Sequence, residues 1–166
     1  MEVDFINLIN NNRALIFKVC NMYCRDPEGR KDLFQEVVLQ LWKSFPGFRK
    51  ESAHSTWIYK VAINTAISNL RKESRKPEKH SLNLLDFEIP DLPANNLVDD
   101  QWEMLKLAIE KLTEIEKAIL LLYLDEKSYE EMREIIGISS SNVGARLNRI
   151  KTKLVKLVKT NSYDAR

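Results

Sequence analysis

The sequence predicts an all-α protein made of two small helical domains joined by a flexible linker. Glycine and proline are scarce, with four and five among 166 residues, while leucine, isoleucine, lysine and glutamate are abundant. This composition favours helices. Apolar residues recur at three- and four-residue spacing on both sides of a proline-containing stretch, and no alternating pattern indicates strands. We therefore expect a three- to four-helix bundle followed by a second module of four helices.

The boundary between the two modules is a stretch in which the helical pattern lapses. Proline cannot continue a helix, and asparagine favours turns; the interrupting residues are Pro77, Pro90, Pro93, Asn95 and Asn96. Residues 81–100 also carry five acids and no lysine or arginine. The assignment that follows is a first domain at 1–76, an acidic linker at 77–99, a second domain at 100–160 and a tail at 161–166.

Composition excludes several classes of protein. No apolar run approaches the roughly 20 residues of a membrane span, and the N-terminus lacks the pattern of a signal peptide. We therefore expect a cytoplasmic protein without membrane insertion. Cys20 and Cys24 could share one helix face, as in a metal or redox site, but only His54 and His80 could complete a metal set. Buried free thiols are the favoured interpretation, and neither a metal nor a cofactor is expected.

One helix of the first domain has an apolar face and a polar face. The apolar face, predicted to be core, consists of Leu33, Phe34, Val37, Val38, Leu41, Trp42 and Phe45. The polar face carries Asp32, Gln35, Glu36, Gln40 and Lys43. Leu39 lies among these polar residues. A single exposed leucine is common, but carboxylates and amides around it also suit a docking surface for a basic partner.

The next helix, about 56–75, is apolar around most of its circumference and is expected at the centre of its bundle. Its one polar stripe consists of Trp57, Lys60, Asn64, Ser68 and Arg71. The preceding loop, 48–55, is polar and basic. Bases stack on aromatic rings while lysine and arginine follow phosphates, so this region suits a single-stranded nucleic acid. An ordinary solvated edge is the alternative.

The second domain contains signals for successive helix starts. Thr113 with Glu116, and Ser128 with Glu131, match the spacing of a capping box. Gly137 is placed to end one helix, and the serines at 139 and 140 are placed to cap the next. A helix, a short glycine-containing turn and a second helix predict a DNA-binding helix-turn-helix.

The last helix, 140 to about 158, divides into an apolar stripe and a basic side. The stripe consists of Val143, Leu147, Ile150, Leu154, Leu157 and Val158, and beside it lie Asn142, Arg146, Arg149, Lys153 and Lys156. Residues 138–160 contain six cations and no acid. A recognition helix needs this division, because one face holds the fold while the other enters the major groove. A solvated basic face is the simpler alternative.

Several blocks, in this order, resemble the extracytoplasmic-function (ECF) sigma factors of the sigma-70 superfamily. They are Asp32-Leu33-Phe34-Gln35-Glu36-Val37 with Leu41-Trp42, Thr56-Trp57-Ile58-Tyr59-Lys60-Val61-Ala62-Ile63-Asn64, Leu70-Arg71-Lys72, Leu112-Thr113, Ser128-Tyr129-Glu130-Glu131-Met132, Gly137-Ile138-Ser139, Val143, Arg146-Leu147 and Arg149. The resemblance covers nearly the whole chain. It implies an alternative sigma factor that binds core RNA polymerase, recognises promoter DNA and promotes its melting.

By this resemblance the first domain is a sigma-2 domain. Its implied contacts with core polymerase are Asp32, Gln35, Glu36 and Leu39. Its implied contacts with the single-stranded minus-ten element are Phe48, Arg49, Lys50, Ser52, Ala53, Trp57, Lys60, Asn64 and Arg71. Phe48 and Asn64 match family positions in a pocket for a flipped base. Lys50, His54 and Ser55 differ from common family choices, which predicts a distinct promoter preference.

The second domain is, by the same resemblance, a sigma-4 helix-turn-helix that reads the minus-thirty-five element as duplex. The implied contacts are Ser140, Asn142, Ala145, Arg146, Arg149 and Lys153. Gly144 and Ala145 stand where the family often has long polar side chains, so Arg146 and Arg149 are the expected readers. Arg133 stands where such motifs commonly have alanine, and the sequence gives no firm reason for it.

The expected partners are therefore core RNA polymerase, promoter DNA and an anti-sigma factor, with no small-molecule substrate and no catalysis by the chain itself. Two alternatives remain open. One is a helix-turn-helix regulator that acts without polymerase, and the other is a helical adaptor whose basic face binds an acidic protein. No nucleophile with its base, phosphate-binding glycine loop or metal set indicates an enzyme.

Overall fold

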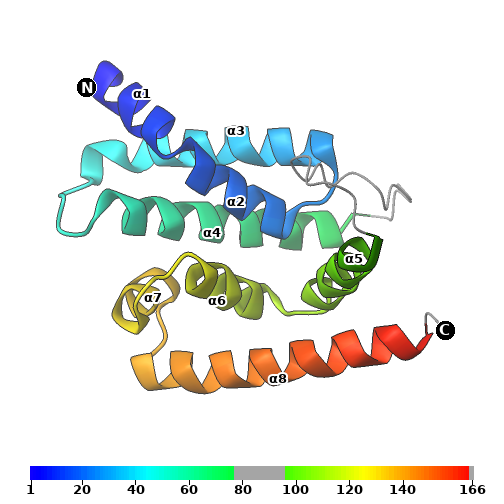
Figure 1. Cartoon of the computed structure of the whole chain (residues 1–166). Helices are drawn as coiled ribbons and strands as arrows, with labels where there is room; N and C mark the ends of the chain where they lie inside the picture. The colour runs from blue at the N-terminus through cyan, green and yellow to red at the C-terminus, as the bar shows by residue number, and fades with distance from the viewer. Residues whose placement is uncertain (77–95, 165–166) are drawn as a thin grey trace. The chain divides into compact units, whose positions relative to one another are not determined.

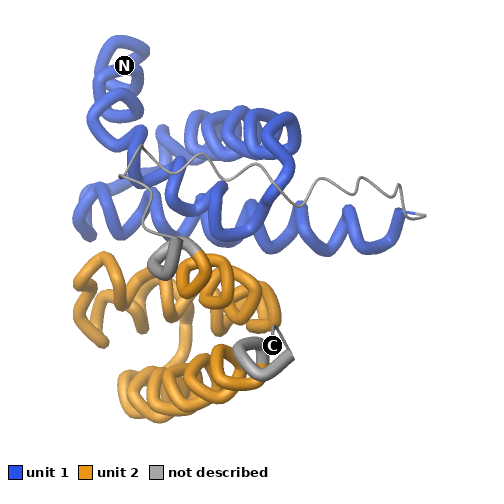
Figure 2. Tube along the Cα trace, turned by 45° about the vertical axis from the view of Figure 1, so that its right-hand side comes forward, with its two compact units in different colours: residues 1–87 blue, residues 88–166 orange. Residues whose placement is uncertain are grey.

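The structure, a computed structural model, describes residues 1–76 and 96–164, and these contain helices and no strand. The chain divides into two compact units, residues 1–87 and 88–166 (Figure 2). This confirms the predicted all-α fold of two helical domains. Most of the predicted acidic linker, residues 77–95, lies outside the described residues.

The first unit is a bundle around a central helix. Its elements are α1 (Glu2–Asn11), α2 (Arg13–Tyr23), α3 (Pro27–Ser44), the short 3₁₀ helix η1 (Phe45–Gly47) and α4 (His54–Ser74) (Figure 1). Helix α4 packs against both α2 and α3, which gives it the central position that its apolar circumference predicts. The loop between η1 and α4 carries most of the candidate minus-ten residues.

The N-terminal segment forms two helices, α1 and α2, which are separated at Asn12, so that the described part of the first unit has the upper number of the three to four helices predicted for it. The side-chain amide of Asn12 donates a hydrogen bond to the carbonyl oxygen of Leu8 at 2.8 Å. Asparagine competes with the backbone for such partners and therefore favours helix ends.

Helix α3 begins with a side-chain cap. The Asp26 side chain accepts a hydrogen bond from the Gly29 N–H at 2.9 Å, and Pro27 occupies the first turn.

The core of the first unit is narrower than the predicted apolar face of α3. Leu33, Val37 and Leu41 are buried, as expected. Trp42 is 40% exposed, and the remaining members of the face are only half-buried: Phe34, Val38 and Phe45. The edges of the face are thus not core, because a helix between two neighbours buries a stripe and not half of its circumference.

The second unit packs three helices against a long one. Its elements are α5 (Asn96–Glu110), α6 (Glu114–Leu124), α7 (Tyr129–Ile136) and α8 (Ser140–Asp164) (Figure 1). Helix α8 packs against α5, α6 and α7. A core cluster is formed by Leu112, Ile119, Leu120, Leu147 and Ile150, so the apolar stripe of α8 anchors it as predicted.

Two helix limits differ from the sequence prediction. Helix α5 begins at Asn96, inside the predicted linker. Helix α8 continues to Asp164, into the predicted tail. No glycine or proline follows Gly144 in the sequence, so no backbone breaker ends the helix at 158.

The cysteines do not form a bridge. Cys20 is buried and Cys24 is half-buried, and both are free thiols. Burial raises the pKa of the Cys20 thiol from 9.0 to about 12. Among the described residues, no cluster of three or more histidines, cysteines and acids could hold a metal ion. None of the described helices is long and apolar enough to cross a membrane.

Candidate nucleic-acid interfaces

The loop that leads into α4 is organised around two stacked rings. The ring of Phe48 lies on the ring of Trp57, with centroids 4.6 Å apart and planes inclined by 26°. His54 approaches Phe48 with a centroid distance of 5.2 Å. Lys50, at the bend of the loop, has a φ of 57°, a left-handed conformation that is unusual for a residue with a side chain. The loop is therefore sharply turned around an aromatic pair.

This aromatic pair borders an open hollow of about 490 Å³. The hollow is lined by Lys43, Ser44, Gly47, Phe48, Arg49, Glu51, Ser52 and Trp57. Its wall thus combines two rings with two cations, two hydroxyls and the carboxylate of Glu51. A base extruded from a strand needs a stacking surface and polar partners for its edge, while its phosphates need nearby cations. The hollow supplies each of these groups.

The other candidate minus-ten residues follow one exposed side of α4. Lys60, Asn64, Ser68 and Arg71 are exposed, and Trp57 is half-buried. In the loop Arg49, Lys50 and Ala53 are exposed and Ser52 is half-buried. The chain thus presents an aromatic end and a polar, basic track along a single helix.

Phe48 and Asn64, which the resemblance places in one pocket, line different hollows. Asn64 contributes to a groove of about 520 Å³ between α3 and α4. The groove is lined by Asp32, Glu36, Gln40, Asn64, Thr65, Ser68, Asn69 and Lys72. Two candidate polymerase contacts, Asp32 and Glu36, therefore lie beside the track on α4.

The remaining polymerase candidates, Gln35 and Leu39, are exposed on α3, and Leu39 is 44% exposed. Gln40 donates from its Nε2 to the Oε1 of Glu36 at 2.8 Å. Gln40 and Lys72 were not predicted as site residues, although Gln40 follows Glu36 by one helical turn and Lys72 directly follows Arg71. That spacing is a signal that could have found them.

Both predicted capping boxes are confirmed in the second unit. The backbone N–H of Thr113 donates to Oε2 of Glu116 at 2.8 Å, and the Glu116 N–H donates to the Thr113 hydroxyl at 3.3 Å. Ser128 and Glu131 make the same pair of bonds, at 2.7 and 3.1 Å. The backbone hydrogen bond from Ser128 lowers the pKa of Glu131. These caps fix where α6 and α7 begin.

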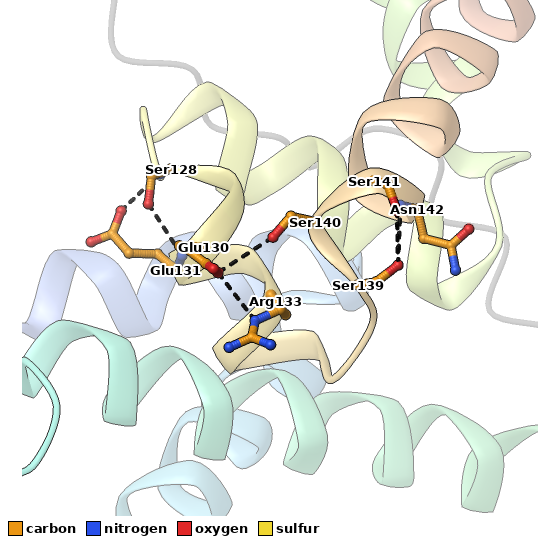
Figure 3. Close-up of polar contacts among 8 residues, drawn as sticks. All are labelled: Ser128, Glu130, Glu131, Arg133, Ser139, Ser140, Ser141 and Asn142. Carbon is orange, nitrogen blue, oxygen red and sulfur yellow. Dashed lines mark hydrogen bonds and ion pairs between the residues drawn. The ribbon is translucent and has the colours of Figure 1, made fainter.

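The turn between α7 and α8 is also built from local signals. Gly137 ends α7 with a φ of 83°, in the left-handed region that glycine adopts without strain. The hydroxyl of Ser139 then accepts a hydrogen bond from the Asn142 N–H at 3.3 Å, so Ser139 caps α8 (Figure 3). Gly137 and Ser139 thus set the helix-turn-helix geometry.

A polar contact that the sequence did not predict ties α7 to the first residue of α8. The Ser140 hydroxyl donates to Oε2 of Glu130 at 3.3 Å, and the same carboxylate oxygen lies 3.1 Å from Nε of Arg133 (Figure 3). Arg133, which the sequence left unexplained, therefore holds an ion pair at the surface of the turn. Ser140, a candidate DNA contact, directs its hydroxyl proton to Glu130.

The outer side of α8 carries the candidate readers. Asn142, Ala145, Arg146 and Arg149 are exposed. Within the described part of the chain, neither arginine makes an ion pair or hydrogen bond through its side chain, which leaves both guanidinium groups available to phosphates or base edges. Lys153 differs, because its Nζ lies 2.8 Å from Oε2 of Glu116.

Gly144 has a packing role that the sequence did not reveal. A Cβ atom at this position would lie 3.3 Å from Cε2 of Tyr129, the first residue of α7. The absence of a side chain therefore lets the ring of Tyr129 approach the backbone of α8 closely. Gly144 is thus in contact with α7, although its low helix propensity makes it unfavourable within α8.

Two polar or basic surfaces on two helical domains, one beside an aromatic hollow and one on a helix-turn-helix, are typical of a DNA-binding protein of the transcription machinery. Family models agree with this class: the model of sigma-70 region 2 matches residues 8–76, and that of sigma-70 region 4 matches residues 102–154.

Relatives of known function extend the comparison. The chain is 30% identical over 131 residues to the ECF RNA polymerase sigma-E factor of Haemophilus influenzae, covering 72% of this chain and 69% of that protein. It is 28% identical over 131 residues to the protein of the same name from Escherichia coli, with the same shares covered. The chain belongs to the ECF family of RNA polymerase sigma factors and is an alternative sigma factor for transcription initiation.

Solved structures show the same fold. The sigma factor RpoE of Bartonella quintana, in complex with the anti-sigma factor NepR, superposes with a TM-score of 0.69 at 19% identity, covering 94% of this chain and 97% of that one. CnrH, in complex with the cytosolic domain of CnrY, gives a TM-score of 0.70 at 13% identity, with 96% and 90% covered.

Proposed function

We propose that this sigma factor divides promoter recognition between its two units. In the first unit Asp32, Gln35, Glu36 and Leu39 bind core polymerase, while the loop and α4 bind the non-template strand of the minus-ten element. In the second unit α8 reads the minus-thirty-five element as duplex. The stack of Phe48 on Trp57 beside the 490 Å³ hollow is the observation that carries the first of these roles.

Strand opening requires compensation for the lost stacking of an extruded base, which costs a few kcal/mol. The aromatic pair offers a stacking surface, and the exposed Lys60 and Arg71 of α4 offer cations along the path of the strand. Because the rings are already stacked in the free protein, little side-chain ordering has to accompany capture of the base. These features favour melting at the minus-ten element.

Duplex recognition rests on the exposed arginines of α8. Arg146 and Arg149 lie three residues apart and therefore on one side of the helix. Neither is paired among the described residues, and Val143, Leu147 and Ile150 hold the opposite side in the core. Arginine is the commonest reader of guanine in the major groove. Asn142 and Ala145 complete the proposed surface. Ser140 and Lys153 also belong to it, although their side chains contact Glu130 and Glu116 in the structure.

The test of this function is run-off transcription with core RNA polymerase and a genomic promoter library. The wild-type chain should bind core and direct initiation from a subset of promoters, and failure of both would overturn the proposal. Phe48→Ala should impair promoter opening while core binding is retained. Phe17→Ala is a matched control, because Phe17 is also partly exposed and stacks on Phe34, outside the hollow. Normal open complexes with Phe48→Ala would refute the pocket.

We further propose that the chain acts in the cytoplasm, performs no catalysis itself and takes no small-molecule substrate, because the core enzyme makes the RNA. Regulation by an anti-sigma factor is supported by the fold that it shares with two sigma factors solved in complexes. Co-purification from the native host tests this partner. Recovery with core polymerase alone, under conditions in which the promoters are silent, would count against an anti-sigma factor.

A further inference from the structure

We propose that Phe5, on the N-terminal helix α1, is a positioning residue for the minus-ten loop, an inference that rests on the proposed function of that loop. Phe5 is far from the loop in sequence and belongs to none of the candidate sites. It is connected to the loop by a continuous series of ring contacts. Helix α1 would thereby determine how well the base pocket is formed before DNA arrives.

The first step in the series joins α1 to the end of α3. Phe5 is only 6% exposed. Its ring lies 5.0 Å from the ring of Trp42 and 5.3 Å from the ring of Phe45, with interplanar angles of 66° and 64°. Both are edge-to-face arrangements, which aromatic pairs prefer. Phe5 therefore contacts one ring from the last turn of α3, that of Trp42, and one ring from η1, that of Phe45.

The second step joins η1 to the hollow. The ring of Phe45 lies 6.3 Å from that of Trp57, and Trp57 stacks on Phe48. In addition, the backbone N–H of Phe48 donates to the carbonyl oxygen of Phe45 at 3.1 Å. Phe45 therefore touches both members of the stacked pair, one through its ring and the other through its backbone.

Helix η1 directly continues α3, and the backbone N–H of Phe45 donates to the carbonyl oxygen of Trp42. Its three residues, Phe45, Pro46 and Gly47, include no buried residue, and Pro46 lacks an amide hydrogen. Because the ring of Phe5 packs edge-to-face with that of Phe45, its removal gives the Phe45 ring room to tilt, and Phe48 shifts with it. A loosened pocket captures a base less well, because the ordering that was complete in advance must then occur upon binding.

The alternative is that Phe5 only stabilises α1, as any buried residue does. Ile9 provides the matched control, because Phe5 and Ile9 are the two buried residues of α1 and Ile9 has no ring. Phe5→Leu and Ile9→Val are both conservative, so both variants are expected to fold. A specific role for the ring predicts that only the first one affects the pocket.

The experiment uses the full chain with core polymerase and a fork-junction promoter in which 2-aminopurine replaces the base expected to flip. Phe5→Leu should lower the affinity for the fork by about tenfold, because a loosened pocket must be ordered when the base binds, and it should reduce the 2-aminopurine signal. Its affinity for core and for a minus-thirty-five duplex should stay within about twofold of wild type. Ile9→Val should behave as wild type in all assays.

Base capture by Phe5→Leu equal to that of wild type would overturn the inference. An equal loss with Ile9→Val would also overturn it, because the effect would then belong to α1 as a whole. If wild type itself binds core but gives no 2-aminopurine signal at any recognised promoter, the proposed function of the loop fails instead. The three results are distinguishable within one set of measurements.

Discussion

A single carboxylate oxygen of Glu116 joins the start of α6 to the middle of α8. Its Oε2 atom lies 2.8 Å from Nζ of Lys153 and accepts the backbone N–H of Thr113 at the same distance. The capping box of α6 therefore also anchors the recognition helix. Lys153 consequently has a structural partner, and its proposed contact with DNA competes with that partner.

The contribution of this ion pair can be isolated by substitution. Lys153→Met should lower the free energy of unfolding by about 0.5–1 kcal/mol, a modest value because the side chain of Lys153 is 38% exposed and the pair is partly screened. Glu116→Gln should cost a similar amount, because glutamine can still complete the capping box. Urea denaturation of both single variants and the double variant gives the coupling energy. Additive effects would show that the contact contributes nothing.

The same pair predicts an acid-dependent loss of stability. Burial alone would raise the pKa of Glu116, but the hydrogen bonds from Lys153 and Thr113 outweigh it and lower the pKa below 4.5. A lowered folded-state pKa stabilises the protein above the ordinary value, and this stabilisation disappears as the pH falls through the folded-state pKa. We expect wild type to lose more stability than Glu116→Gln between about pH 5 and 3. Parallel stability curves over this range would contradict the assignment.

The close contact between Gly144 and Tyr129 leads to a prediction of increased, not decreased, stability. Gly144→Ala should raise the thermal stability of the second unit, because alanine gains about 1 kcal/mol of helix propensity over glycine. The new Cβ atom would lie 3.3 Å from the ring of Tyr129, which is 45% exposed and can move outward. The net gain should be about 0.5 kcal/mol. A fall in melting temperature, measured by circular dichroism, would show that the ring cannot yield.

The features that were predictable from the sequence are those set by neighbouring residues. The capping boxes at Thr113 and Ser128 and the glycine at 137 depend on contacts within about four residues, so the residue types alone identify them. The exposed track on α4 and the basic side of α8 follow in the same way from the helical period. Their predicted roles at core polymerase and DNA stay predictions.

The features that were not predictable join residues far apart in sequence. The pairing of Glu116 with Lys153, the insertion of Phe5 beside Phe45 and the contact of Ser140 with Glu130 each require two helices to be placed in three dimensions. Periodicity identifies a buried face but not the residue that it meets. The separation of Phe48 from Asn64 into two hollows was missed for the same reason.

Cys20 provides a prediction at alkaline pH. Burial raises the pKa of its thiol from 9.0 to about 12, so the unfolded chain loses this proton more readily than the folded one. The free energy of unfolding is therefore unaffected by ionisation of this thiol below pH 9.0, and it falls as the pH rises from 9.0 toward 12. Cys20→Ala should be destabilised at neutral pH through lost packing, and the gap from wild type should narrow above pH 9.0. Urea denaturation at pH 8 and 10 tests this; a constant gap would place the thiol in a more solvated site.

Arg149→Ala should weaken binding to the minus-thirty-five duplex without changing the stability of the fold, because Arg149 is exposed and makes no side-chain ion pair among the described residues. If the guanidinium contacts a phosphate, the slope of log affinity against log salt should become shallower by about one, equally for all duplex sequences. If it reads a base, the loss should be confined to the preferred sequence and amount to about 1–3 kcal/mol.

Lys151→Ala is the matched control for this measurement, since Lys151 is a cation on the same helix whose ammonium contacts Tyr123, 3.1 Å from the hydroxyl and 4.4 Å from the ring centroid. Its charge is already engaged within the unit, so its removal should alter the salt slope less than that of Arg149. Fluorescence anisotropy across a salt series, with the preferred duplex and a scrambled one, separates these outcomes. Unchanged affinity and slope for Arg149→Ala would remove this residue from the interface and leave Arg146 as the principal reader.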